Sequence, residues 1–251
     1  MTGKETAMSE PLILWGMPSP NVTKVVLMIE ECELACELRH VAGFTGEQFA
    51  PEFHAKSPLA KVPVPEDPRL GRPLVESGAI LHWLAEREGR FLPQSQPARA
   101  EVMQWLMIQM ANVGPMLGQV NHFNVVPQDT EHYARARYRA IAAGLYRALD
   151  DRLAGEEWLA GGDYSIADMA THPWAHYLER HGFAPADYPA LVRWRTAIDE
   201  RPATRRAIDR VRNEFLELSN QSRAAASPDD LDRFFNRTSE VPPANYSAVQ
   251  Q

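Results

Sequence analysis

The pattern of apolar residues changes near residue 93, and this change constrains the fold more than any other feature of the sequence. Before it, short apolar runs such as residues 12–15 alternate with helical stretches, whereas beyond it we find helical periodicity alone. Residues 92–97 hold two prolines and small polar residues, as is typical of a linker. The sequence therefore predicts an α/β domain at residues 10–93, an all-helical domain at 97–220 and a C-terminal tail at 221–251.

The first domain shows the mixed pattern of an α/β sandwich with strands in both directions. Its elements follow the order β-α-β-α-β-β-α. We expect strands at residues 12–15, 37–41, 62–65 and 73–75, and helices at 21–32, around 49–53 and at 76–88. The turn sequence of residues 67–71 separates the last two strands.

The second domain is expected to be a helical bundle. We expect helices at residues 99–113, 133–153, 165–182, 190–199 and 201–217, separated by short Gly and Pro breaks. From residue 221 the chain is rich in Ala, Ser and Pro, which predicts a loosely ordered tail. Leu231, Phe234 and Phe235 could dock this tail on the body of the protein.

The composition excludes several classes of protein. A net charge of −7, without a Lys/Arg-rich run, argues against nucleic-acid binding. The longest apolar run, residues 25–29, is too short to cross a membrane, and residues 1–10 lack the apolar core of a secretory signal. The two cysteines cannot form a disulfide framework. We therefore expect a soluble cytoplasmic protein without a nucleic-acid or membrane partner.

Three segments carry residues suited to ligand binding. Ser19 and Asn21 precede a helix whose free N–H groups could face an anion or a thiolate, although the segment alone favours a turn and a cap. Glu76 and Ser77 open another helix, which could bind a carboxylate or be an ordinary helix start. A cis Val62–Pro63 bond would free backbone groups for an extended ligand, but the local sequence favours trans.

Other patterns are assigned structural roles. His172 and His176 are four residues apart, with Glu179 three further on, a spacing that metal ligands can have. The Glu that a zinc protease carries beside its first His is missing, and we therefore expect no metal site. Ser165 and Asp168 form a capping-box-like pattern, which predicts a helix start. The two cysteines are expected to be buried or inert thiols.

Three motifs, taken in order, resemble the cytosolic glutathione transferase superfamily over roughly residues 10–215. They are Ser57-Pro58 with Lys61-Val62-Pro63, then Glu76-Ser77-Gly78-Ala79-Ile80, then Trp158-Leu159-Ala160-Gly161 with Tyr164-Ser165-Ile166-Ala167-Asp168. The resemblance implies a thioredoxin-like N-terminal domain followed by an all-helical C-terminal domain. It also implies a homodimer that uses glutathione as co-substrate.

A narrower resemblance is to the Nu class, the bacterial relatives of the yeast protein Ure2. Its marks are Pro18-Ser19-Pro20-Asn21, Gln48-Phe49 with Pro51-Glu52-Phe53, Gly114-Pro115-Met116-Leu117-Gly118-Gln119, His122-Phe123-Asn124 and residues 133–138. Leu59-Ala60 departs from the class, which typically has Asn-Asn before the Lys. The segment 65–72 also looks shorter and richer in proline. Both departures could reshape one wall of the pocket.

The resemblance implies roles for individual residues. Asn21, with the hydroxyl of Ser19, would hold the glutathione sulfur and stabilise its thiolate. The other glutathione contacts implied are Gln48, Lys61, Val62, Pro63, Glu76, Ser77 and Arg137. Among them the Val62 backbone would pair with the cysteinyl portion, which now favours a cis bond before Pro63. Arg137, from the helical domain, would reach a second glutathione or glutathione disulfide.

The chemistry that the resemblance implies requires glutathione to react as a thiolate at neutral pH. A free thiol has a pKa near 8.5, so the protein would have to stabilise the thiolate. No protein cysteine lies at residues 17–20, so the reacting sulfurs would be those of glutathione. The expected function is a glutathione-dependent disulfide-bond oxidoreductase, with transferase or peroxidase activity, acting on a small disulfide or electrophile. The alternatives are a one-glutathione S-transferase or ether-cleaving lyase, and a non-catalytic Ure2-like glutathione-binding protein.

Overall fold

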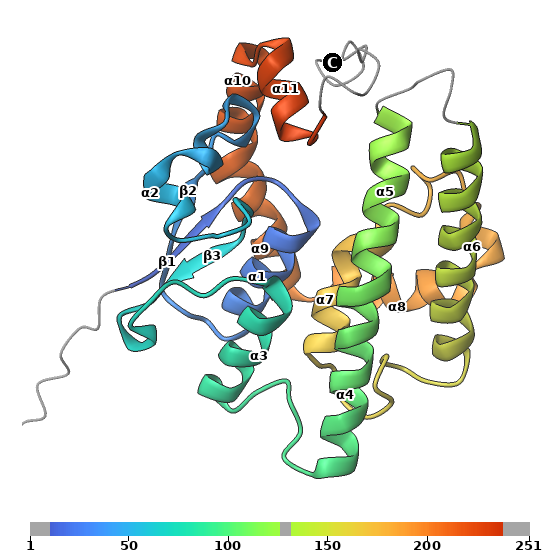
Figure 1. Ribbon diagram of the computed structural model, residues 1–251. Coiled ribbons are helices and arrows are strands. Elements are labelled where there is room, and N and C mark those ends of the chain that lie inside the picture. Colours follow the sequence, from blue (N-terminus) through green and yellow to red (C-terminus); the bar gives the residue numbers. More distant parts are fainter. Residues whose placement is uncertain (1–10, 126–131, 238–251) are drawn as a thin grey trace, which may run out of the picture.

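The computed structural model describes residues 11–125 and 132–237 and shows two units side by side (Figure 1). The first unit combines a small sheet with helices, and the second is helical, so the predicted fold class is confirmed. The elements of the first unit are β1 (Leu12–Gly16), α1 (Pro20–Glu31), β2 (Cys36–His40), α2 (Pro51–His54), β3 (Val64–Glu66) and α3 (Ser77–Glu88). The domain limits given above stay a prediction.

The sheet has three strands in the order β2-β1-β3. β2 runs parallel to β1 and β3 runs antiparallel to it, which confirms the mixed strand directions. The fourth strand that the sequence predicts at residues 73–75 is not formed. Leu74 donates a backbone hydrogen bond of 3.4 Å to Pro65, but Pro73 has no N–H to donate, and this limits pairing with β3.

The second unit is built from helices throughout its described residues. They are α4 (Gln96–Ile108), α5 (Gly114–Val125), α6 (His132–Ala154), α7 (Ile166–Ala175), α8 (Pro189–Asp199), α9 (Pro202–Val211), α10 (Glu217–Ala225) and α11 (Pro228–Phe234). The helix predicted at residues 99–113 does not end there, because the π-helical segment Gln109–Val113 joins α4 to α5. Pro115 has no N–H to donate, so the regular pattern of helical hydrogen bonds is interrupted there. The π-helical segment, with its wider turn, lies just before this proline.

α7 is shorter than predicted but begins where the sequence places it. The capping box of Ser165 and Asp168 is confirmed. The Asp168 carboxylate also accepts hydrogen bonds from the backbone N–H of Leu159 and from Nε1 of Trp194. The helix ends at Ala175, and the chain continues in turns to residue 182.

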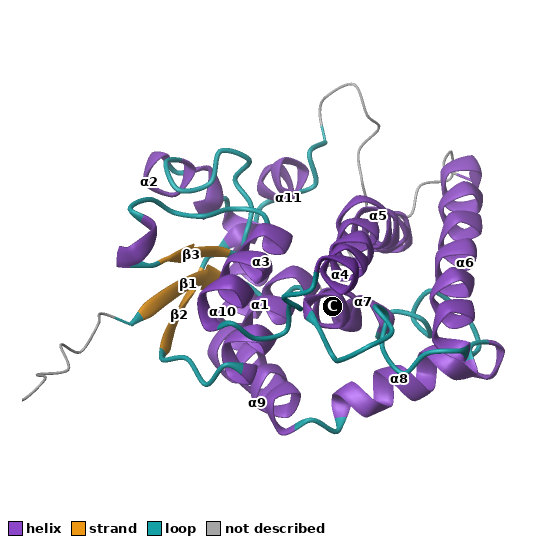
Figure 2. Ribbon diagram, turned by 90° about the horizontal axis from the view of Figure 1, so that it is seen from below, coloured by secondary structure: helices purple, strands orange, loops and turns teal. Residues whose placement is uncertain are grey.

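The sheet and the helical unit are packed through α1 and α3. Side chains of β1 alternate between the two faces of the sheet. Leu12 and Leu14 are buried in the main core with residues of α1 and α3, whereas Trp15 points to the other face, with its ring 6.3 Å from that of Phe53. Figure 2 shows α1 and α3 between the sheet and helices α4 and α7, so the interface between the units is made of helices.

The chain beyond residue 221 is more ordered than the sequence predicts. α10 continues to Ala225, and a second capping box, Ser227 with Asp230, starts α11. Leu231 is fully buried and the ring of Phe234 lies 4.6 Å from that of Phe44, so the predicted docking of these two residues is confirmed. The prediction of a loosely ordered tail is therefore wrong for residues 221–234. Residues 238–251 lie outside the described part of the chain.

Within residues 11–125 and 132–237, no helix combines enough length with enough apolar character to cross a membrane.

Candidate functional site

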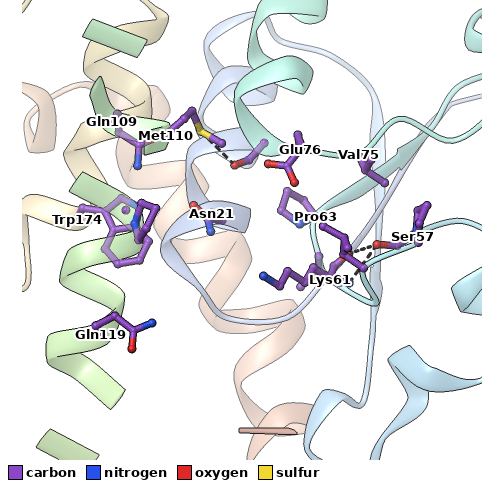
Figure 3. Close-up of a pocket in the computed structure, with 16 residues that line it drawn as sticks. Asn21, Ser57, Lys61, Pro63, Val75, Glu76, Gln109, Met110, Gln119 and Trp174 are labelled. Atoms are coloured by element: carbon purple, nitrogen blue, oxygen red, sulfur yellow. Dashed lines mark hydrogen bonds between the residues drawn. The ribbon is translucent and has the colours of Figure 1, made fainter. Parts of the chain in front are cut away.

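A cavity of about 360 Å³ lies between the two units (Figure 3). One wall comes from the start of α1, the loop of residues 57–63 and the start of α3. The opposite wall comes from the π-helical segment, α5 and α7, which contribute Gln109, Gln119 and Trp174. The cavity thus lies where residues distant in the sequence meet, as ligand pockets often do.

A second cavity of about 270 Å³ adjoins the first. Asn21, Lys61 and Val62 line both cavities. The second is also lined by Ser19 and by residues that follow β2, and Phe234 from α11 closes one side of it. The segment beyond residue 221 therefore contributes directly to the site.

Ser19 and Asn21 are brought together at the start of α1. Ser19 is the N-cap of the helix, and its Oγ accepts a hydrogen bond of 3.2 Å from the backbone N–H of Val22. Because the oxygen accepts this bond, the hydroxyl proton is still available to a ligand. The amide of Asn21 lies between the two walls in Figure 3 and has no hydrogen bond to another described residue. Both groups can donate to an anion.

A buried lysine lies at the boundary between the units. Nζ of Lys24 donates hydrogen bonds to Oε1 of Gln109 at 2.9 Å and to Sδ of Met110 at 3.4 Å. Burial lowers the pKa of Lys24 from 10.5 to about 7, and the charge of Glu76 acts in the opposite direction. The Lys24 side chain therefore lies close enough to Glu76 for the charge of that residue to favour protonated Lys24.

Glu76 and Ser77 form the start of α3 in the first cavity. Glu76 has φ 69° and ψ 109°, a conformation that is costly for an L residue and that is found preferentially at ligand sites. Ser77 is the first residue of the helix, so backbone N–H groups of the first turn have no partner within it. A carboxylate beside free N–H groups matches a ligand that carries both an ammonium and a carboxylate.

The loop of residues 57–63 holds backbone groups against the cavity. The Val62–Pro63 bond is cis, as the resemblance implies and against the expectation from local sequence. Ser57 Oγ donates to the Lys61 carbonyl at 2.9 Å and accepts from the Lys61 N–H at 3.0 Å, which closes the loop. Between them Ala60 has φ 51°. The Lys61 side chain is exposed at the cavity and offers a positive charge.

Gln48 and Arg137 differ in their position. Gln48 is buried in the lining of the second cavity, and its Oε1 has no hydrogen-bond partner among the described residues. Arg137 is exposed on α6 and lines neither cavity, so the structure does not bring it to Asn21. Its contact with a second glutathione stays a prediction.

Several residues that line the cavities were not assigned to the site from the sequence. They are Gln109, Met110, Trp174, Phe234 and Asn236. A glutamine inside an apolar helical stretch was the available signal for Gln109, because buried polar side chains need a partner. The others have the apolar or loop character of ordinary packing residues, and nothing local distinguishes them.

The cysteines lie outside both cavities and are free. Burial raises the pKa of Cys32 to about 11 and that of Cys36 to about 12. Both thiols are therefore protonated at neutral pH and are poor nucleophiles, which confirms the expectation of inert thiols.

Comparison with known proteins agrees with this arrangement. Residues 10–86 match the N-terminal domain and residues 115–202 the C-terminal domain of glutathione S-transferase. The disulfide-bond oxidoreductase YfcG of Escherichia coli is 42% identical over 200 residues, which are 78% of this chain and 93% of YfcG.

Solved structures show the same fold. A glutathione transferase family member from Pseudomonas fluorescens, with two glutathione bound, is 38% identical with a TM-score of 0.74, over 81% of this chain and 95% of that one. Ure2p in complex with glutathione is 26% identical with a TM-score of 0.75, over 79% of this chain and 98% of that one. This chain therefore belongs to the glutathione S-transferase superfamily, among its Nu and Ure2-like members.

Proposed function

We propose that this protein is a glutathione-dependent disulfide-bond oxidoreductase that binds two glutathione molecules, or glutathione disulfide, in the two adjoining cavities. The observation that carries the proposal is that Asn21 lines both cavities, so that a ligand in each would share one group of donors. The name of YfcG and the two glutathione molecules in the Pseudomonas fluorescens structure support it.

In the first cavity the proposed contacts follow the charges of glutathione. The Glu76 carboxylate pairs with the γ-glutamyl ammonium, and the N–H groups at Ser77 receive its carboxylate. The backbone of Val62 pairs with the cysteinyl residue, next to Pro63, and Lys61 faces a carboxylate of the tripeptide. These contacts direct the thiol toward the start of α1.

The thiolate is stabilised by the amide of Asn21, the hydroxyl of Ser19 and the N-terminus of α1. Lowering a thiol pKa by one or two units corresponds to about 1.4–2.7 kcal/mol of preference for the thiolate. In the second cavity Gln48 would contact the other ligand.

The reaction consumes two glutathione molecules for each disulfide. The first thiolate attacks one sulfur of the substrate, which forms a mixed disulfide and releases one thiolate. The second glutathione thiolate attacks the glutathione sulfur of that mixed disulfide, which forms glutathione disulfide and releases the second thiolate. The two thiol protons of glutathione end on the two product thiols. No protein cysteine takes part.

We also propose a homodimer in the cytoplasm. Met107 is 49% exposed on α4, and the apolar residues Met103 and Trp105 are close to it in the sequence. Two free cysteines are compatible with a reducing compartment. Analytical ultracentrifugation of the wild type and of Met107→Glu tests the dimer.

The test of function is steady-state reduction of a small mixed disulfide by glutathione, measured beside conjugation of an aryl halide. Disulfide turnover that clearly exceeds conjugation is expected. Dominant conjugation or ether cleavage would instead indicate a one-glutathione transferase or lyase. Bound glutathione with neither activity would indicate a non-catalytic binding protein.

Asn21→Ala tests the assignment of the thiolate site, with Asn213→Ala, an exposed position in the π-helical segment after α9, as the matched control. The first variant should lose turnover while keeping most of its affinity for glutathione, and the control should keep both. Loss of affinity together with turnover would contradict the role of Asn21 as a donor to the sulfur.

A further inference from the structure

Three side chains, from α7, from the residue that follows it and from the end of α8, converge on the side of α7 that faces away from the cavity. His172 Nε2 lies 2.8 Å from Asp199 Oδ1, and His176 Nε2 lies 3.0 Å from the same oxygen. The two Nε2 atoms are 3.2 Å apart. Trp174, which lines the cavity, is two residues from each histidine, about 200° around the helix, so the cluster and the cavity lie on opposite faces of α7.

Hydrogen bonding alone accounts poorly for this triangle. A neutral imidazole carries a single N–H, so if both Nε2 atoms donate to Asp199 Oδ1, the 3.2 Å contact between them joins two N–H groups and is not itself a hydrogen bond. The His172 side chain is buried, and its Nδ1 has no hydrogen-bond partner among the described residues. The orientation of this buried ring therefore depends on what its Nε2 contacts in the cluster.

The three distances match one face of a metal coordination polyhedron. Bonds of about 2.0–2.1 Å from Zn²⁺ to nitrogen and oxygen separate the ligand atoms by about 3.3 Å in a tetrahedron and about 2.9 Å in an octahedron. The observed separations of 3.0 and 3.2 Å fall in that range, and the separation of 2.8 Å lies just below the octahedral value. The side chains of His176 and Asp199 are 41% and 35% exposed, so the remaining coordination positions face solvent.

The carboxylate suggested by sequence spacing is not the third ligand. Glu179 accepts two hydrogen bonds from Arg195, of 2.6 and 2.9 Å. The positive charge of Arg195 is therefore paired with Glu179. Arg205 donates to the backbone carbonyl of Asp199, at 3.4 Å, and not to its carboxylate. The carboxylate of Asp199, the last residue of α8, therefore contacts the two histidines and is not paired with Arg205.

We propose that His172, His176 and Asp199 bind a divalent transition-metal ion of the Zn²⁺, Co²⁺ or Ni²⁺ class and so join α7 to α8. Two imidazoles and one carboxylate are ligands that these ions accept, and the absence of a thiolate in this trio argues against a Cu⁺ site. The ion has a structural role in the helical unit, where it holds the ends of α7 and α8 together. This site goes beyond the proposed glutathione chemistry and takes no part in it.

The test uses the full-length protein after treatment with a chelator and dialysis, in the absence of glutathione, whose thiol would itself bind metal. Titration with Co²⁺ is expected to give one equivalent of binding with a visible ligand-field band, and Zn²⁺ should displace it. Because the ion binds the folded protein, Zn²⁺ should also raise the melting temperature.

His176→Ala and Asp199→Asn are expected to lower Zn²⁺ affinity by about tenfold or more. The matched control is His82→Ala, because His82 also has a carboxylate one turn away, Glu86 at 3.9 Å, without a third ligand. This variant should bind Zn²⁺ like the wild type. Circular dichroism and glutathione affinity report whether each variant is folded.

Three results would overturn the site. They are equal Zn²⁺ affinity in the wild type and in folded His176→Ala, loss of binding in the His82 control, and binding that leaves the melting temperature unchanged. Either of the two ligand variants suffices for the comparison if the other does not fold.

Discussion

Lys24 and Gln109 are joined by a hydrogen bond of 2.9 Å across 85 residues of sequence, and both side chains are almost completely buried. Lys24 belongs to α1 in the first unit, and Gln109 begins the π-helical segment of the second. The bond therefore connects the two units at the first cavity, to whose lining Gln109 belongs. It also places a titratable group between them.

The stability contributed by Lys24 should depend on pH. Its pKa is about 7 in the folded protein and 10.5 in the unfolded chain, because burial disfavours the charge. Below pH 7 both states hold the proton, and the cost of burying the charge is fully present. Between about pH 7 and 10 the unfolded state binds more protons, so stability rises with pH.

Lys24→Met removes this dependence. Its melting temperature relative to the wild type should be highest at about pH 6–7 and should fall steadily toward about pH 10. Thermal unfolding of both proteins across this range measures the difference. A difference that does not change with pH would show that Lys24 does not titrate in this window.

Glu76→Gly should increase stability and weaken glutathione binding together. The φ of 69° costs a glutamate about 1–3 kcal/mol, which glycine largely avoids. We expect the free energy of unfolding to rise by about 1 kcal/mol, and glutathione affinity to fall at least tenfold because the ammonium loses its partner. Urea denaturation and glutathione titration measure the two effects. Glu76→Gln, which keeps the backbone cost, should weaken binding without the gain in stability.

Ala60→Asn should stabilise the loop at the edge of the cavity. Ala60 has φ 51°, a left-handed conformation that costs alanine about 1–2 kcal/mol and that asparagine adopts more readily. We expect a gain of about 0.5–1 kcal/mol in urea denaturation. Ala55→Asn, at φ −62° in an exposed position, is the control and should give no gain. Equal effects at both positions would argue against the backbone explanation.

Phe234→Ala should weaken ligand binding more than it destabilises the fold. The ring closes one side of the second cavity and packs 4.6 Å from that of Phe44. We expect a several-fold higher KM for glutathione with a nearly unchanged kcat, since the donors at Asn21 are untouched. Leu218→Ala, an exposed residue of α10, should change neither constant. An unaltered KM in Phe234→Ala would exclude α11 from the binding site.

Local features of this protein were predictable because their contacts are close in sequence. The Ser165 and Asp168 capping box involves residues three apart, so its pattern is visible in the chain itself. The same holds for the starts of α1 and α3, which locate Asn21 and Glu76 at helix N-termini. The change from mixed to helical periodicity likewise separated the two units without reference to their packing.

The tertiary structure decided which distant residues meet. The periodicity of α7 shows that His172 and His176 share a face, but only the packing of α8 brings Asp199 there and turns Glu179 to Arg195. Gln109 reaches Lys24 in the same way, and Phe234 reaches the second cavity. Helical spacing marks a buried face but carries no information about the element that covers it, because that depends on the angles at which whole helices pack.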